Sequence, residues 1–335
     1  MNYSERLHAK TLLLVDDEPA NLHVLKQILQ EDAHLLFARN GQQALEIASS
    51  QHPDLVLLDV MLPDIDGYEV CMRLKQAAPT ANIPVIFISA MSDTLDEAHG
   101  FEVGAVDYIC KPVNPAIVRA RIATHLSLVQ AKELQRTHLQ LIRTLGRAAE
   151  YRDNETGLHV IRMSHYAHQL ALSAGLSKKA ADELLHAAPM HDVGKIGIPD
   201  HILLKPGALD DDEWITMKKH PEFGAQIIGE HDSSLLKAAS TIALSHHEKW
   251  DGSGYPNGLK GTDIPLVGRI IAIVDVFDAL TTARPYKKAW TVEDATDLIR
   301  RESGRHFDPE LVERFIGILP QVLEIKQRWA ETPVH

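Results

Sequence analysis

The sequence predicts an α/β domain followed by an all-α domain, from three observations. In the first third of the chain, apolar runs such as TLLLV, DLVLLD and PVIFIS alternate with helix-length amphipathic segments, which is typical of a parallel sheet covered by helices on both faces. After residue 152 the pattern is helical and histidines accumulate. The 335 residues, 45% of them hydrophobic, suffice for two cores. We expect a doubly wound five-stranded parallel sheet, joined by a long helix to a helical domain.

The composition argues against several classes of protein. The net charge is −12 and no run of Lys or Arg exceeds two residues, so a DNA-binding output domain is not expected. Cys71 and Cys110 are the only cysteines and form no CxxC pair, which argues against disulfide scaffolding and thiolate metal sites. No apolar run approaches the roughly 18 residues of a membrane span. We expect a cytoplasmic protein without membrane insertion.

Polar residues follow the predicted strands of the first domain. They are Asp16 and Asp17 after TLLLV, Asp59 after LVLL, Ser89 after VIFI and Lys111 after VDYIC. In a parallel sheet, ligands gather at the carboxyl ends of the strands. Any one of these residues alone is explained more simply as a helix cap or a solvated charge. Clustered acids, however, repel one another unless a hard cation such as Mg²⁺ neutralises them.

Over about 115 residues these motifs resemble the receiver domain of two-component response regulators, which has a flavodoxin-like fold. The resemblance implies that a sensor histidine kinase supplies a phosphoryl group to Asp59. It also implies a cis peptide bond between Lys111 and Pro112. We expect this domain to span residues 1–126. The implied residues are Asp16, Asp17 and Asp59 for Mg²⁺, with Asp59 as phosphoacceptor, and Ser89, Tyr108 and Lys111 for the switch.

Residues 115–152 are expected to form one long helix or two nearly continuous ones. After Pro115 the segment has no proline and a single glycine, Gly146, and it is rich in Ala, Leu, Gln, Arg and Lys. Gln135, Arg136 and His138 interrupt any strict heptad, so a coiled coil is predicted only in part. The segment is either a signalling helix that forms a homodimer or a packed linker. We assign residues 127–147 to the linker and 148–335 to the second domain.

Several residues of the second domain suit metal ions. Glu155 and His159 are four apart, so on a helix they would project from one face. Asp275 lies in the apolar run RIIAIVDVFDAL, where an unpaired carboxylate would be costly. A lone histidine is usually structural, but so many donors in one domain indicate a metal site. Imidazole and carboxylate without thiolate suit Fe, Mn, Ni or Zn. The remaining candidates are His191 and Asp192 in MHDVGK, His220 in KKHPEFG, and His246 and His247 in HHEKWDGSGYP.

The HD of MHDVGK and the HHEKWDGSGYP stretch resemble the HD-GYP phosphodiesterases, a subgroup of the HD superfamily of metal-dependent phosphohydrolases, over roughly residues 150–335. The resemblance implies hydrolysis of cyclic di-GMP to pGpG, with GMP as a further candidate product, by a hydroxide that bridges metal ions. Two or three metal ions are implied, and we expect Fe or Mn in preference to Ni or Zn. The implied ligands are Glu155, His159, His191, Asp192, His220, His246, His247 and Asp275.

Four further residues are candidates for contact with the substrate. Lys195 follows His191 by one predicted helical turn and could, with Asp192, act in catalysis. Arg284 and Lys287 match the family's phosphate-binding positions, and Tyr255 would lie against the ligand in a glycine-rich turn. Surface solvation or turn packing are the alternatives for these side chains. The alternatives for the whole protein are a cyclic di-GMP sensor with little turnover and a phosphodiesterase that prefers pGpG or another cyclic dinucleotide.

Overall fold

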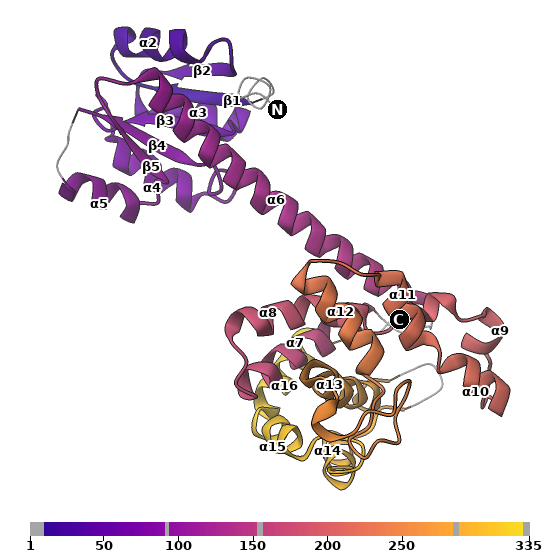
Figure 1. Cartoon of the computed structure of the whole chain (residues 1–335). Coiled ribbons are helices and arrows are strands. Elements are labelled where there is room, and N and C mark those ends of the chain that lie inside the picture. The colour runs from indigo at the N-terminus through magenta and orange to yellow at the C-terminus, as the bar shows by residue number, and fades with distance from the viewer. Residues whose placement is uncertain (1–9, 91–93, 153–156, 284–287, 331–335) are drawn as a thin grey trace. The chain divides into compact units, whose positions relative to one another are not determined.

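The computed structural model describes residues 10–90, 94–152, 157–283 and 288–330. The chain divides into two compact units, residues 1–135 and 136–335 (Figure 1). Three of the predicted site residues, Glu155, Arg284 and Lys287, lie outside the described residues.

The first unit contains a five-stranded parallel sheet, as predicted. Its strands are β1 (Thr11–Val15), β2 (His34–Ala38), β3 (Leu55–Asp59), β4 (Val85–Ser89) and β5 (Asp107–Cys110). Their order in the sheet is β2-β1-β3-β4-β5. The strand order reverses between β1 and β3, and in doubly wound sheets this is the point where ligands bind.

Helices cover both faces of this sheet (Figure 1). They are α2 (Pro19–Leu29), α3 (Gly41–Gln51), α4 (Gly67–Gln76) and α5 (Thr94–Glu102), with the start of α6 (Pro115–Arg152). Because side chains alternate along a strand, Leu13 of β1 packs with Val70 of α4 in one buried cluster. Leu12 and Leu14 pack with Leu22 of α2 and Ile122 of α6 in another. Burial on both faces explains why β1, β3 and β4 are mostly apolar, whereas the edge strand β2 is partly exposed.

Helix α6 is one continuous helix of 38 residues, which confirms the first of the two predicted arrangements. Its single glycine has a packing role at the end that lies in the second unit. A β-carbon at Gly146 would lie 2.3 Å from the backbone oxygen of Pro189. Gly146 therefore permits α6 to lie against the short 3₁₀ helix η1 (Ala188–Met190).

The second unit is helical, as predicted. Its elements after α6 and η1 are α7 (Gly157–Ser173), α8 (Lys178–Ala187), η2 (Val193–Gly197), α9 (Asp200–Leu203), α10 (Asp211–Met217), α11 (His220–Ile228), α12 (Ser234–Ser245), η3 (Gly261–Asp263), α13 (Leu266–Thr281), α14 (Val292–Arg301), α15 (Pro309–Gly317) and α16 (Leu319–Arg328). One apolar core joins α7, α8, α12, α13 and α15, and it includes Tyr166, Phe277 and Phe315. Across the described ranges, no helix combines the length and apolar character that a membrane crossing requires.

Candidate functional site

The first candidate site lies at the carboxyl ends of β1 and β3. Asp16, Asp17 and Asp59 each offer an oxygen, and these oxygens lie within 4.8 Å of one another. Lys111 places Nζ 2.8 Å from Oδ2 of Asp16 and 2.6 Å from Oδ2 of Asp59. Burial raises the pKa of Asp59, and the charge of Lys111 opposes this rise. Three carboxylates and one ammonium suit an oxygen-liganded cation such as Mg²⁺.

The predicted switch residues lie on the neighbouring strands. Ser89 ends β4 and is buried. Tyr108 of β5 is also buried, with its ring centroid 6.4 Å from that of Phe87. The peptide bond between Lys111 and Pro112 is cis, as expected. Ser89 thus ends β4 and Lys111 directly follows β5, at the same carboxyl edge of the sheet where Asp59 ends β3.

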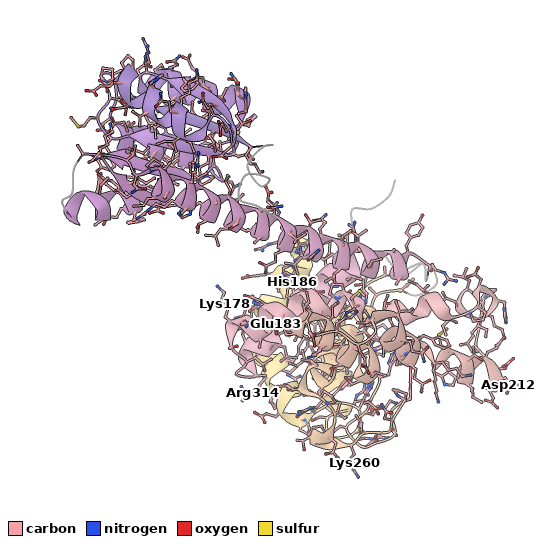
Figure 2. The ribbon with its side chains drawn as sticks, turned by 45° about the horizontal axis from the view of Figure 1, so that its top comes forward. Lys178, Glu183, His186, Asp212, Lys260 and Arg314 are labelled. Atoms are coloured by element: carbon pink, nitrogen blue, oxygen red, sulfur yellow. The ribbon has the colours of Figure 1, made fainter. Side chains whose placement is uncertain are left out.

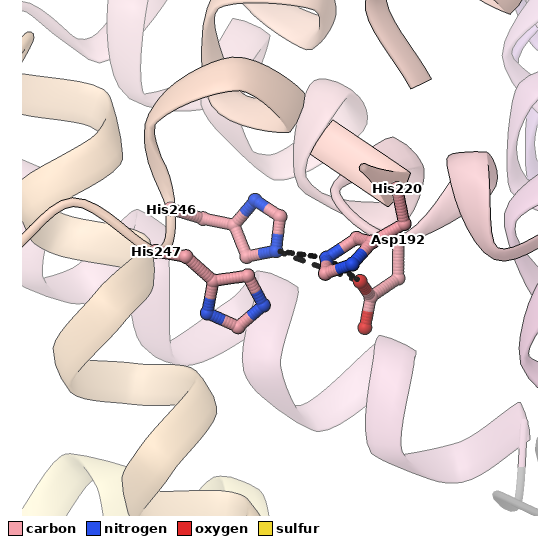
Figure 3. Close-up of side chains that lie close together, drawn as sticks. All are labelled: Asp192, His220, His246 and His247. Atoms are coloured by element: carbon pink, nitrogen blue, oxygen red, sulfur yellow. Dashed lines mark hydrogen bonds and ion pairs between the residues drawn. The ribbon is translucent and has the colours of Figure 1, made fainter. Parts of the chain in front are cut away.

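The second candidate site brings together four residues from three separate segments of the helical unit. Asp192 lies between η1 and η2, His220 begins α11, and His246 and His247 directly follow α12. Nε2 of His220 lies 3.2 Å from Oδ1 of Asp192 and 3.5 Å from Nε2 of His246 (Figure 3). Each of the four residues offers a ligand atom within 4.8 Å of the others. Asp192, His220 and His246 are buried.

His220 and His246 present their Nε2 atoms to the interior of the group. Nδ1 of His220 bonds to the carbonyl of Met217 at 2.8 Å, and Nδ1 of His246 lies 3.0 Å from the carbonyl of Ala243. A carbonyl only accepts hydrogen bonds, so Nδ1 carries the proton and the neutral ring keeps its lone pair on Nε2. This is the tautomer in which histidine binds a metal through Nε2.

Burial keeps two of these rings neutral. It lowers the pKa of His246, and with the neighbouring rings of His246 and His220 it lowers the pKa of His247 well below the usual value. Neutral imidazole is the form that coordinates metal ions. The donor chemistry of the group, three imidazole rings and one carboxylate, therefore fits a transition-metal ion.

A second group of ligand atoms adjoins the first. It consists of His159 of α7, His191 and Asp275 of α13. Nε2 of His159 lies 3.3 Å from Oδ1 of Asp275. Nε2 of His191 lies 3.2 Å from Oδ2 of Asp192, the carboxylate whose other oxygen faces His220. Asp192 thus stands between the two groups, where its carboxylate can reach two neighbouring cations.

A buried ion pair supports His159 from behind. Nδ1 of His159 lies 2.9 Å from Oδ2 of Asp278. Arg162 donates to both oxygens of the same carboxylate, from Nε and from Nη2, at 2.8 Å each. Burial alone would lower the pKa of His159, but its bonds to Asp275 and Asp278 raise it well above the usual value. Asp278 therefore fixes the ring with Nε2 toward Asp275, which is the arrangement of a carboxylate behind a metal-binding histidine.

Lys195 and Tyr255 border these groups. The segment after His191 forms the 3₁₀ helix η2 and not the α-helical turn that the spacing suggested. Nζ of Lys195 nevertheless lies 2.8 Å from Oδ2 of Asp192. The ring of Tyr255 stacks on His247, with centroids 4.8 Å apart and planes at 27°. Both side chains therefore contact residues of the group formed by Asp192, His220, His246 and His247.

The turn that carries Tyr255 is held close to His247 by its neighbours. A β-carbon at Gly254 would lie 2.3 Å from the backbone nitrogen of Lys249, so only glycine allows this approach. The carboxylate of Glu248 is buried and accepts from the backbone N–H groups of Asn257, at 2.8 Å, and Leu259, at 3.0 Å. The turn is thus fixed from both of its sides.

Two family models match the chain. The response regulator receiver domain matches residues 12–123, and the HD domain matches residues 128–311. The chain is an HD-domain response regulator. Of the curated relatives, a "probable cyclic di-GMP phosphodiesterase" of Vibrio cholerae is 40% identical, over 98% of this chain and 82% of its own length. The "cyclic di-GMP phosphodiesterase response regulator RpfG" of Xanthomonas campestris is 37% identical, over 94% of this chain and 89% of its own.

A third relative aligns with a shorter part of the chain. The "3'3'-cGAMP-specific phosphodiesterase 2" of Vibrio cholerae is 50% identical over 194 residues, which are 58% of this HD-domain response regulator and 37% of the relative. The relatives' names thus include two different cyclic dinucleotides.

Two residues of this HD-domain response regulator have a structural role that was not predicted from the sequence. Glu248 follows the two histidines directly, and that adjacency was a signal that could have found it. Arg162 lies three residues after His159, on the same side of α7. Nothing in its local sequence shows that it is buried, because its partner Asp278 is more than a hundred residues away.

Proposed function

We propose that this HD-domain response regulator is a metal-dependent phosphodiesterase that hydrolyses cyclic di-GMP to pGpG. The observation that carries the proposal is the convergence of seven predicted ligands into two adjoining groups, with Asp192 between them. The relatives named as cyclic di-GMP phosphodiesterases align over nearly the whole chain, which supports this substrate class. GMP remains a candidate for a further product.

The residues of the site divide into those that hold metal ions and those that face the substrate. His220, His246, His247 and Asp192 would hold one ion, and His159, His191, Asp275 and Asp192 a second. Bound metal ions activate water and neutralise phosphate charge; Fe and Mn suit this donor set, as do Ni and Zn. Glu155, which would serve a third ion, lies outside the described residues.

Lys195 and Tyr255 are the described residues that we assign to the substrate. The Lys195 ammonium beside Asp192 can bind a phosphate oxygen and so place the phosphodiester next to the metal ligands. Tyr255, stacked on His247, offers an aromatic face at the same border. Arg284 and Lys287 are proposed as further phosphate contacts on the sequence alone, since both lie outside the described ranges.

We propose that Asp59 accepts a phosphoryl group from a sensor histidine kinase and that this changes turnover in the helical unit. Asp59 lies beside Lys111 and the two acids that would hold Mg²⁺, as phosphoryl transfer to a carboxylate requires. Because α6 is one continuous helix, a change at its start can be transmitted along it. Beryllofluoride, which mimics the phosphoryl group, should therefore change the turnover of the wild type and leave that of Asp59→Asn unchanged. Equal turnover of both proteins, with and without beryllofluoride, would contradict this regulation.

A homodimer through α6 is part of this proposal. Four leucines of this helix expose more than half of their surface: Leu128, Leu134, Leu141 and Leu145. Leu134 and Leu141 are seven residues apart and Leu145 follows by four, which is a heptad-like spacing. A second copy of the same helix would cover these side chains. Sedimentation should show a dimer for the wild type and a monomer for Leu134→Glu with Leu141→Glu; a wild-type monomer would contradict this part.

One observation favours a second substrate. The 3'3'-cGAMP-specific relative is 50% identical over 194 residues, whereas the probable cyclic di-GMP phosphodiesterase is 40% identical over 360 residues. Both substrates present the same phosphodiester linkages to the metal ligands and differ in one base. Turnover of cyclic di-GMP, 3'3'-cGAMP and pGpG should therefore be measured side by side; a kcat/KM that is higher for either of the last two would reassign the substrate.

The deciding experiment is anaerobic purification with metal analysis, followed by cyclic di-GMP turnover. We expect turnover to follow metal content and to vanish in His191→Ala with Asp192→Ala. The matched control is His231→Ala, which removes an exposed histidine outside both groups and should keep both metal and activity. Full metal loading with bound but unhydrolysed cyclic di-GMP would contradict the proposal and identify a sensor.

A further inference from the structure

A cavity of about 210 Å³ lies in the helical unit, lined by parts of α6, α7, α8, η1 and the residue after α16. None of the seven candidate metal ligands that the structure describes in this unit lines it. It is smaller than the roughly 300–1,000 Å³ of pockets for drug-sized ligands, so a cyclic dinucleotide exceeds it. Its size suits a small ligand. The lining is Gln140, Arg143, Thr144, Arg147, Val160, Ile161, Ser164, His165, Leu185, Pro189 and Trp329.

One face of α6 supplies most of the polar lining. Gln140, Arg143, Thr144 and Arg147 follow each other at the spacing of a single helix face. Arg143 and Arg147 are one turn apart, so their like charges repel. Among the residues with described side chains, neither arginine forms an ion pair with a carboxylate. Nη2 of Arg143 instead lies 3.3 Å from Nδ1 of His186 on α8, a residue labelled in Figure 2.

Among the residues whose side chains the structure describes, no acid lines this cavity, although the protein as a whole carries a net charge of −12. Burial lowers the pKa of His165, and the charges of Arg143, His168, Arg328 and His186 lower it further. The charged groups that lower the pKa of His165 are all cationic or can become so. With two arginines and no described acid in its lining, the cavity suits anions better than cations.

We propose that this cavity binds a small anion that carries a phosphate group. Arg143 and Arg147 supply two guanidinium groups that can each donate two hydrogen bonds to phosphate oxygens. The hydroxyl groups of Thr144 and Ser164 and the amide of Gln140 add neutral donors within the same lining. A bound dianion would relieve the repulsion between the two arginines.

The cavity wall is connected to a candidate metal ligand. The backbone oxygen of Trp329, a lining residue, accepts from Nη1 of Arg162 at 3.2 Å. Arg162 holds Asp278, and Asp278 holds His159. An anion that moves Trp329 would thus act on the residues behind the metal site, so the cavity is suited to an effector.

The test is calorimetric titration of the full-length, metal-loaded protein with inorganic phosphate and, separately, with GMP. Beryllofluoride and Mg²⁺ are left out, so that the receiver site is not occupied. The double variant Arg143→Gln with Arg147→Gln should bind phosphate in the cavity about tenfold more weakly or worse, because charge-assisted hydrogen bonds are lost. Phosphate binding at the metal ligands would persist in this variant. The difference between the titration of the wild type and that of the variant therefore reports binding in the cavity.

Two more variants complete the test. Arg136→Gln removes an exposed arginine of the same helix that does not line the cavity, and it should bind like the wild type. Gln140→Glu keeps both arginines and adds a carboxylate to the lining, and it should also weaken binding. Binding that is equal in the wild type, the double variant and Gln140→Glu would overturn the proposal. If GMP binds more tightly than phosphate, the ligand is a phosphate ester; if it binds no better, phosphate itself is the ligand.

Discussion

The Nε2 atoms of His220 and His246 face each other at 3.5 Å, while the Nδ1 atom of each ring bonds to a backbone carbonyl. With both protons on Nδ1, two lone pairs point at one another and at the carboxylate of Asp192. Buried lone pairs that point at one another repel unless a cation lies between them. We therefore expect this repulsion to destabilise the metal-free helical unit and a bound metal ion to remove it.

Metal removal should lower the thermal stability of the helical unit. At a free metal concentration 100 times Kd, binding contributes about 2.7 kcal/mol. We expect Mn²⁺ or Fe²⁺ to raise the melting temperature of chelated wild-type protein and to have a much smaller effect on His246→Ala. Differential scanning calorimetry measures both, with His231→Ala as the control that should respond like the wild type. An equal response of His246→Ala would show that His246 holds no ion.

Arg162 should be more important for stability than an exposed arginine. Arg162→Met leaves the buried carboxylate of Asp278 without its bidentate partner, and breaking a buried ion pair costs about 3–5 kcal/mol. Arg300, which pairs with Asp297 at 3.4 Å and is 53% exposed, is the control, since exposed pairs contribute about 0–1 kcal/mol. Chemical denaturation measures both free energies. Similar losses for Arg162→Met and Arg300→Met would refute the role of this pair.

Gly254 should not tolerate a side chain. A β-carbon there would lie 2.3 Å from the nitrogen of Lys249 and 2.5 Å from the α-carbon of Glu248, and overpacking of this kind costs roughly 1–3 kcal/mol. Gly254→Ala should also displace Tyr255 from His247 and raise KM. The matched control is Gly317→Ala, because a β-carbon at Gly317 meets nothing within 4 Å. Equal kinetics and stability in the two variants would argue against a fixed turn.

Asp64 should make the receiver unit sensitive to acid. Backbone N–H groups of Gln42 and Gly41 lower the pKa of this carboxyl from 3.8 to about 2. A lowered pKa means that the carboxylate stabilises the fold above pH 3.8 and that this contribution is lost as the pH falls through about 2. Nuclear magnetic resonance titration should give that midpoint. The melting temperature of Asp64→Asn should lie below that of wild type at pH 7 and approach it in acid, whereas Glu31→Gln, at an exposed position, should match wild type throughout.

The sequence by itself determined the elements and most of the candidate site residues. The apolar runs fixed the five strands, and because parallel strands share one carboxyl edge, Asp16, Asp59 and Lys111 had to meet there. The absence of proline after Pro115 predicted a helical segment and left open whether it is one helix or two nearly continuous ones; the structure shows one, α6. These properties depend on neighbouring residues and on a topology that has few alternatives.

Tertiary packing alone decided how the ligands are grouped and supported. Asp192 turns one oxygen to His220 and the other to His191, and this depends on how α7, α11, α12 and α13 pack. The pair of Arg162 and Asp278 and the cavity beside Arg143 join residues that are more than 40 positions apart. No local pattern encodes such contacts, because they form only when the helices bury their apolar faces against one another.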